Sequence, residues 1–365
     1  MLISPVLSFA LVIAGGQTSP TQIPQTQTGT VAGQATTSVA NIADLQKPAS
    51  AGDASAQFEL GKAFEQGSGV QQNPEQAAIW YRKAADQGNA KAQNSLGVLY
   101  WMGEGVEKDK KEAVKWYHMA ARRGDASAMF NLGAAYYNGE GVMSIDDNQA
   151  YAWFLLSEDG GNSSGRDAAQ RSKSEHGPAA LNEACFTVGE MYEKGNDLPK
   201  NLDAASAWYR RAAEKGHAQA QVNLALLAMA AKNYGDTRQW CERAAKGGNG
   251  GGLFCLGFLD QQGLGVEKNP KSALKWYEQA ASHGNNAAMQ RLGEMFANGE
   301  GTKQDRAQAF VWFVQAARRN KDATAAAASL RASLSPKEWK DAEKMLKAQG
   351  LDPQKITEVL SSAKP

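Results

Sequence analysis

A motif that returns every 36 residues constrains this chain more than any other feature of its sequence. Gly97 is followed at offsets of 6, 8, 19 and 20 residues by Gly103, Gly105, Trp116 and Tyr117. The same residue types stand at the same offsets from Gly61, 36 residues earlier: Gly67, Gly69, Trp80 and Tyr81. A fixed period of this length is typical of a solenoid, in which each unit contacts only its neighbours.

Each unit is expected to hold two helices. In the first copy, one helix runs from about Asp53 to the glycine stop at Gly67, where a left-handed backbone needs no Cβ. A second helix starts at Asn73-Pro74, an N-cap followed by proline at the first helical position, and ends at Gly88. One such pair cannot bury its apolar faces alone. We therefore expect an all-α fold, a right-handed α-solenoid superhelix of stacked helix–turn–helix repeats.

The residue pattern of the motif also resembles that of a known family. The pattern L-G-x-x-Y-x-x-G-x-G-V, an Asp or Asn N-cap and then A-x-x-W-Y-x-x-A-A-x-x-G resembles the Sel1-like repeat, a relative of the tetratricopeptide repeat. The resemblance covers roughly residues 53 to 320 in seven copies, anchored on Gly61, Gly97, Gly133, Gly189, Ala225, Gly257 and Gly293. It implies a protein–protein interaction module of a kind frequent in bacterial envelope and secreted proteins, and it implies no reaction.

The N-terminal region differs from the repeats. Residues 1–16 are expected to be a signal peptide, because the apolar run from Val6 to Ala14 is too short to span a bilayer and small residues follow it. Residues 17–48 are rich in Gln, Thr, Ser and Pro, and we expect a disordered linker. The mature protein is thus expected to begin near Gln17 and to be periplasmic or secreted.

The repeats themselves fall into two arrays. Residues 49–184 would hold repeats 1–3 with a cap-like segment, residues 185–320 repeats 4–7, and residues 321–365 C-terminal capping helices. The cap-like segment matches no repeat, but residues 177–184 line up with residues 335–342. The alternative is chance similarity between two polar helices. If the segment is a cap, residues 49–184 should fold alone.

Charge and motif content exclude several classes of function. Lys plus Arg number 39 and Asp plus Glu 38, so no charge imbalance favours nucleic acid or anionic lipid. The four histidines stand at unrelated repeat positions, and no nucleophile or phosphate-binding motif occurs. We expect no catalytic residue, no metal site and no cofactor. We also expect a monomer that is not stably inserted in a membrane. The alternative is an enzyme or enzyme subunit, for example a hydrolase like the β-lactamase-like relatives, although K-T-G and S-D-N elements are missing.

Three cysteines, Cys185, Cys241 and Cys255, leave the redox state open. In cysteine-rich members of the family that this chain resembles, a disulfide joins the second helix of one repeat to the first helix of the next. Cys241 and Cys255 stand on those two helices, but both are shifted from the family's positions. A bridge between them, three free thiols and other pairings all remain possible.

The candidate binding surface is the first-helix face, which lines a concave groove in the family that the chain resembles. Trp101 stands four residues after its anchor glycine, a position so variable between copies that we expect it to be exposed. Exposed Trp, Tyr and Met are typical of binding hot spots. The alternative is that Trp101 and Tyr137 pack on each other. We expect a non-catalytic scaffold that binds a peptide or protein partner through Val98, Trp101, Met102, Ala134, Tyr137, Asn138, Glu190 and Phe258.

Overall fold

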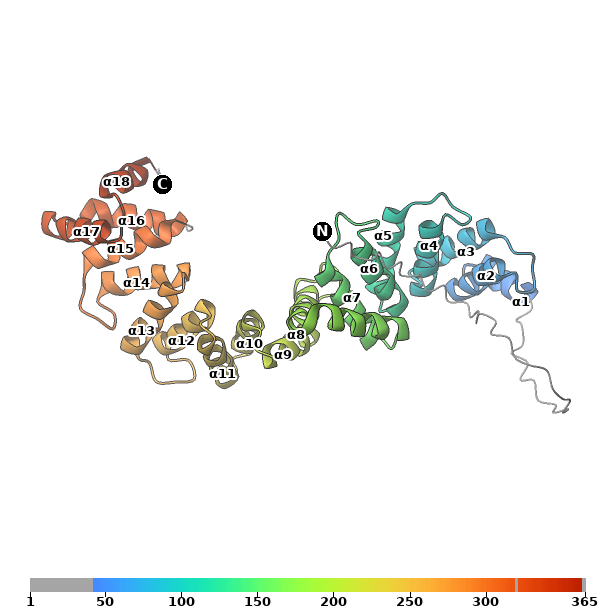
Figure 1. The fold of residues 1–365 in the computed structure, drawn as a ribbon, viewed down its shortest axis with the longest axis horizontal. Helices are drawn as coiled ribbons and strands as arrows, with labels where there is room; N and C mark the ends of the chain where they lie inside the picture. Colours follow the sequence, from blue (N-terminus) through green and yellow to red (C-terminus); the bar gives the residue numbers. More distant parts are fainter. Residues whose placement is uncertain (1–41, 319–320, 363–365) are drawn as a thin grey trace. The chain divides into compact units, whose positions relative to one another are not determined.

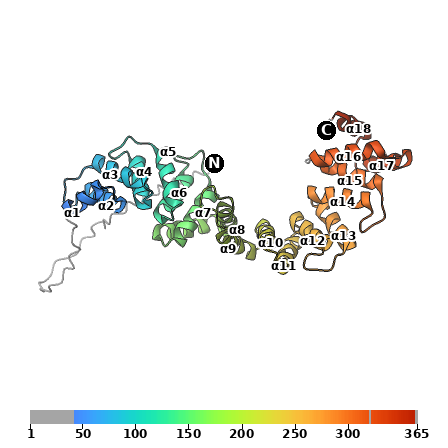
Figure 2. The same ribbon diagram turned by 180° about the vertical axis from the view of Figure 1, so that it is seen from behind.

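The structure, a computed structural model, describes residues 42–318 and 321–362, and within these residues every regular element is an α-helix (Figure 1). The chain divides into two compact units, Met1–Ala205 and Ser206–Pro365. Most successive helices pack on each other in chain order within each unit (Figures 1 and 2). This is the α-solenoid that the repeat predicts.

The first unit holds eight complete helices among its described residues. They are α1 (Ile42–Ser50), α2 (Ala54–Gln66), α3 (Pro74–Asp86), α4 (Ala90–Met102), α5 (Lys110–Ala121), α6 (Ala126–Asn138), α7 (Asp147–Asp159) and α8 (Ser163–Lys194). Helix α9 (Leu202–Glu214) contains the boundary between the units. The second unit continues with α10 (Ala218–Ala230), α11 (Tyr234–Lys246), α12 (Gly250–Gln262), α13 (Pro270–Ser282), α14 (Asn286–Asn298), α15 (Arg306–Ala317), α16 (Lys321–Ser333), α17 (Pro336–Ala348) and α18 (Pro353–Ser362).

Helix α1 corrects the expected linker. Residues 42–48, assigned to a disordered segment, form most of this helix, and its Ala49 is 1% exposed against Leu60 of α2. The Gln57 side chain donates to the Ala49 carbonyl at 3.0 Å. An open solenoid end exposes apolar surface, and α1 covers it. Residues 1–41, which include the expected signal peptide and the rest of the linker, lie outside the described residues.

A close contact between an anchor glycine and an aromatic ring joins the two helices of a repeat. A Cβ added to Gly97 would lie 2.6 Å from a ring carbon of Tyr117, well inside van der Waals contact. The same approach recurs in repeats 1, 3, 6 and 7, between Gly61 and Tyr81, Gly133 and Phe154, Gly257 and Tyr277, and Gly293 and Phe313. In repeat 5 the anchor is Ala225 and the ring is replaced by Cys241, and both are fully buried. A smaller partner thus accompanies the larger anchor.

Helix α8 contains a sharp break at Gly177, whose backbone (φ 76°, ψ −174°) is not helical. Pro178 then starts a second helical segment that reaches Lys194 and includes Gly189, the anchor of repeat 4. Pro336 starts α17 in the same way after the N-cap Ser335. The expected domain boundary after residue 184 therefore falls inside α8, and the compact units divide after residue 205 instead.

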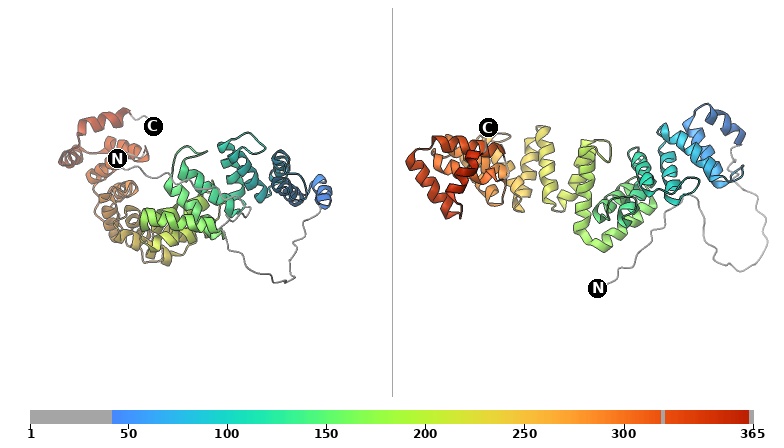
Figure 3. Two further views of the ribbon diagram at one scale, coloured as in Figure 1. Left: turned by 45° about the vertical axis from the view of Figure 1, so that its right-hand side comes forward. Right: turned by 90° about the horizontal axis from the view of Figure 1, so that it is seen from above.

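Helices α16, α17 and α18 pack at the C-terminal end of the second unit, drawn in orange and red in Figure 3. They bury Phe310 of α15, whose ring centroid lies 5.7 Å from that of Trp339. The Arg331 guanidinium lies 3.6 Å from the centre of the Trp339 ring. This packing covers the apolar face that repeat 7 would otherwise expose.

Repeats 1 and 2, and repeats 2 and 3, meet where one second-helix side chain contacts the tryptophan of the next repeat. The Arg82 guanidinium of repeat 1 lies 4.7 Å from the centre of the Trp116 ring of repeat 2 and also bonds the Tyr100 hydroxyl. In repeat 2 the corresponding residue is His118, and its ring centroid lies 5.6 Å from that of Trp153 in repeat 3. Burial lowers the pKa of His118; Asp197 raises it and Arg122 lowers it by smaller amounts.

This histidine predicts an acid-sensitive repeat junction. Because the folded pKa is below the unfolded value of about 6.5, the unfolded chain binds more protons as the pH falls through that value. Stability is therefore lost on acidification until the pH is below the folded pKa. Replacing His118 by Gln should remove this part of the loss. Urea unfolding at several pH values measures the free energy of unfolding of the variant and of the native protein. The difference between these two free energies should change below neutrality, and a difference independent of pH would contradict the assignment.

Candidate binding surface

The structure places the predicted contact residues in several environments. Met102 of α4 is 42% exposed, and Val98, one turn earlier on the same helix, is half-buried. Asn138 at the end of α6 is also half-buried, whereas Ala134 is buried and unavailable to a partner. The prediction for Ala134 is therefore wrong, because this side of α6 packs inside the unit.

Two of the other predicted residues, Glu190 and Phe258, lie farther along the chain. The Glu190 carboxylate accepts from the Lys194 ammonium at 2.7 Å, an ion pair within α8. Phe258 is half-buried on α12 in the second unit. Both side chains are half-buried and leave part of their surface accessible.

Trp101 is not the exposed residue that the sequence suggested. It is 7% exposed, its ring centroid lies 6.2 Å from that of Tyr117, and the Lys110 ammonium lies 5.0 Å from the centre of its ring. The prediction of a solvent-facing tryptophan is wrong. The physical reason is that a residue four positions after the anchor faces the aromatic residue of its own repeat's second helix, not solvent.

The residue four positions after the anchor differs between repeats, and its contact with the second helix accounts for part of this variability. In repeat 1, Glu65 accepts from the Tyr81 hydroxyl at 2.7 Å, and in repeat 6, Gln261 accepts from the Tyr277 hydroxyl at 2.9 Å. Repeat 3 has Phe154 in place of the tyrosine, so no hydroxyl needs a partner there. In repeat 2, Trp101 cannot accept a hydrogen bond, and within the described chain the buried Tyr117 hydroxyl has no partner. An acceptor at this position thus pairs with the tyrosine hydroxyl in repeats 1 and 6, and repeat 2 departs from that pairing.

Tyr137, the other aromatic of the predicted patch, is half-buried and hydrogen-bonds Glu175 of α8. Burial is the largest cause of its raised pKa, followed by the Glu175 charge. Its hydroxyl is therefore used inside the first unit, and a partner would meet only part of its ring.

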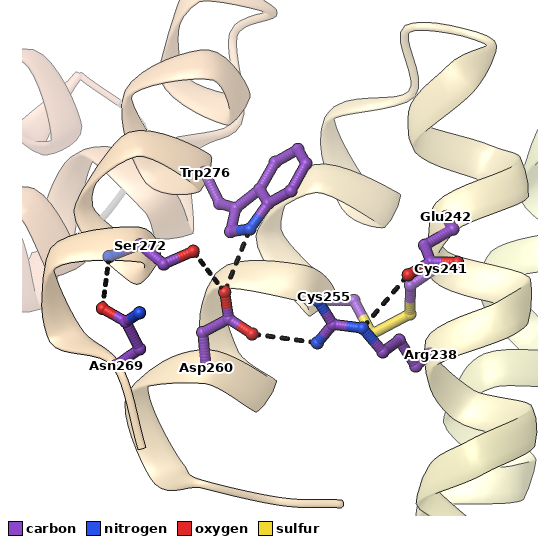
Figure 4. A network of polar contacts seen from close by, with 8 residues as sticks. All are labelled: Arg238, Cys241, Glu242, Cys255, Asp260, Asn269, Ser272 and Trp276. Atoms are coloured by element: carbon purple, nitrogen blue, oxygen red, sulfur yellow. Dashed lines mark hydrogen bonds and ion pairs between the residues drawn. A yellow bond between two sulfur atoms is a disulfide. The ribbon is translucent and has the colours of Figure 1, made fainter. Parts of the chain in front are cut away.

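Figure 4 shows the junction of repeats 5 and 6, which holds the one disulfide among the described residues. Cys241 of α11 and Cys255 of α12 form a disulfide, with Cα atoms 6.0 Å apart. The turn before α11 is short, and its Lys232 is the one non-glycine residue with positive φ (59°) in the described chain. The structure thus selects one of the pairings that the sequence left open; Cys185 is buried elsewhere, in α8.

Beside the disulfide lies Asp260, a carboxylate only 5% exposed (Figure 4). It accepts from Arg238 at 2.9 Å, from the Ser272 hydroxyl at 2.6 Å and from the Trp276 indole at 3.1 Å. The hydrogen bond to Asp260 is the main reason that the pKa of Arg238 is raised. With three donors on one carboxylate, this network is a structural clamp. In the sequence, the sign of this network is the acid Asp260, three residues after the anchor Gly257. Most other copies carry an aromatic residue at this position, such as Tyr100.

Neither metal chemistry nor a membrane span finds support in the described residues. Among residues 42–318 and 321–362, no group of three or more His, Cys, Asp and Glu side chains is placed to hold a metal ion. None of the helices in that part of the chain is both long and apolar enough to cross a membrane.

The hydroxyl pairing predicts opposite effects for two similar substitutions. Tyr81→Phe removes a hydrogen bond to Glu65 and should lower the free energy of unfolding by about 1–2 kcal/mol. Tyr117→Phe removes only an unpartnered buried hydroxyl and should leave stability unchanged or raise it by up to about 1 kcal/mol. Denaturant unfolding of the two variants measures both values; equal losses would show that the Tyr117 hydroxyl has a partner after all.

A family model described as the Sel1 repeat matches residues 54–89, 90–125, 126–162, 182–217, 218–249, 255–285 and 286–321. The search of curated proteins returned no match.

Two solved structures illustrate the similarity. The Escherichia coli protein c5321, described as a protective antigen of uropathogenic strains displaying an SLR fold, is 24% identical, with a TM-score of 0.45 over 89% of this chain and 98% of its own. A Sel1 repeat protein from Oxalobacter formigenes is 27% identical, with a TM-score of 0.39 over 77% of each chain. The seven matched repeats span more than half of the sequence, and the chain therefore belongs to the Sel1 repeat family.

Proposed function

We propose that this protein is an exported, non-catalytic scaffold that binds a peptide or protein partner on the first-helix face of its repeats. Sel1 repeat proteins are generally protein-interaction scaffolds, and the family is typically non-catalytic. The observation that carries the proposal is the surface of α4. Its Met102 is exposed beside the half-buried Val98, on a helix that packs against α3 and α5. Methionine adapts its shape to apolar partners, which suits a binding surface.

A cleft at the other end of α4 supports the same face. It has a volume of about 350 Å³ and is lined by Ser55, Phe58 and Glu59 of α2 and by Asn89, Ala90 and Lys91 at the start of α4. It therefore opens between the first helices of repeats 1 and 2. An aromatic side chain between charges of both signs provides apolar contact and polar recognition together.

The cellular location that we propose is the periplasm or the exterior of the cell. The Cys241–Cys255 disulfide supports it, because structural disulfides persist in oxidising compartments and are rare in reducing cytosol. The apolar segment from Val6 to Ala14 supports it independently from the sequence.

Two matched substitutions test the binding face. Met102 on α4 and Ile79 on α3 are similarly exposed, at 42% and 46%, but lie on a first and a second helix. Met102→Glu should weaken partner binding by on the order of 2 kcal/mol, as loss of a hot spot does, and Ile79→Glu should not. Quantitative crosslinking of the purified variants to envelope proteins from the native organism measures both. A loss confined to Ile79→Glu would place the binding surface on the second helices.

The location has a direct test at the native N-terminus. Mass spectrometry of the protein from its own cells should find a mature chain that begins near Gln17, in the periplasmic or culture fraction. A chain that retains Met1 and stays in the cytosolic fraction would refute export.

A further inference from the structure

Two adjoining hollows lie at the C-terminal end of the second unit. One has a volume of about 230 Å³ and is walled mainly by apolar side chains of α15 and α18, including Val314, Ala317, Ile356 and Val359. The other, of about 440 Å³, is lined by Asn286, Gln315 and Gln349. Arg318 and Leu351 line both. The apolar hollow and a second one of mixed polarity, which Met289 also lines, therefore share a wall.

The charge of this site has one sign. Arg318 and Lys355 are exposed at the apolar hollow, and no carboxylate is among the described residues that line either hollow. Neither cation has an ion pair among the described residues. Two unneutralised cations beside an apolar compartment complement a ligand that joins an apolar group to an anion.

The second hollow adds directional groups. The Gln315 amide donates to the Gln349 carbonyl at 2.8 Å, and the Asn286 amide donates to the backbone carbonyl of Ala316 at 3.0 Å. These bonds orient the side chains so that the Gln349 amide can donate and the Asn286 carbonyl can accept. A peptide backbone offers the complementary acceptor and donor in alternation.

We propose that these hollows bind the C-terminal residue of a partner protein. Its apolar side chain enters the hollow between α15 and α18, its free carboxylate lies between Arg318 and Lys355, and the preceding peptide unit meets the amides of Asn286 and Gln349. This deepens the proposed scaffold function by naming the chemistry of the partner. A fatty acid shares the carboxylate and alkyl group, but a hollow below the usual range for small-molecule sites of about 300–1,000 Å³ fits a single side chain better than a long alkyl chain.

A peptide series tests the proposal on the full mature chain. The probes are fluorescein-labelled hexapeptides that differ only in the last residue, each made with a free or an amidated C-terminus. Fluorescence anisotropy should show Leu, Ile or Phe ends binding about tenfold more tightly than Gly or Asp ends, and amidation should weaken binding about tenfold. Equal binding of amidated peptides, or no binding up to about 1 mM peptide, would overturn the proposal. So would decanoate binding without peptide binding, which would identify a lipid site.

Variants separate the two compartments. Arg318→Glu and Lys355→Glu should each weaken free-carboxylate peptides about tenfold, while Lys340→Glu, on an exposed residue of α17 outside both hollows, should have no effect. Val359 is 63% exposed, so Val359→Ser should keep the fold and lower only the preference for an apolar last residue. An equal loss from Lys340→Glu would overturn the site. Partner capture that depends on Met102 without any peptide binding would leave the scaffold function standing and refute this site alone.

Discussion

The stacking of an aromatic ring on a helical glycine is the contact on which the rest of this fold depends. Where Tyr117 lies on Gly97, the two helices of a repeat approach so closely that any larger anchor would meet the ring. That approach sets the spacing within each helix pair, and the pair sets the face on which the next repeat packs. The regular recurrence of glycine and tyrosine in the sequence is the trace of this one packing contact.

The same contact explains why departures from the motif occur in groups. Repeat 5 has a larger anchor, Ala225, and a smaller partner, Cys241, and its turn is shorter. In place of the aromatic ring, Cys241 forms a disulfide with Cys255. The Asp260 carboxylate on the same helix as Cys255 accepts hydrogen bonds from Arg238, Ser272 and Trp276. The departures of repeat 5 from the motif thus belong to one junction that is built differently from the others described. Covalent and charge-assisted bonds there take over from an aromatic ring.

Features that depend on local chemistry could be predicted from the sequence. The helix pairs, the glycine stops such as Gly103 and the N-caps such as Asn73 follow from backbone geometry alone, and the structure has them. Trp101 could not be placed in this way. Its position varies between repeats, and variability usually accompanies exposure, but here the position faces the second helix of its own repeat, where Glu65 accepts from the Tyr81 hydroxyl in repeat 1. The spacing of 16 residues from Glu65 to Tyr81 and from Gln261 to Tyr277 is the signal in the sequence that this position faces the second helix. The α1 helix and the continuation of α8 through residue 184 depend on tertiary packing, which no single repeat encodes.

The cross-link between α11 and α12 has a mechanical consequence. In a chain whose units touch only their neighbours, force or heat opens the array from its ends, one repeat interface at a time. Such an opening that starts from α18 can peel away successive helices until it meets the Cys241–Cys255 bond. At that point Cys241 and Cys255 stay covalently joined, so α11 and α12 remain tethered even where their packing is lost. The disulfide therefore keeps α11 and α12 tethered when the helices beyond them unfold, and it limits how far the chain between the two cysteines can extend.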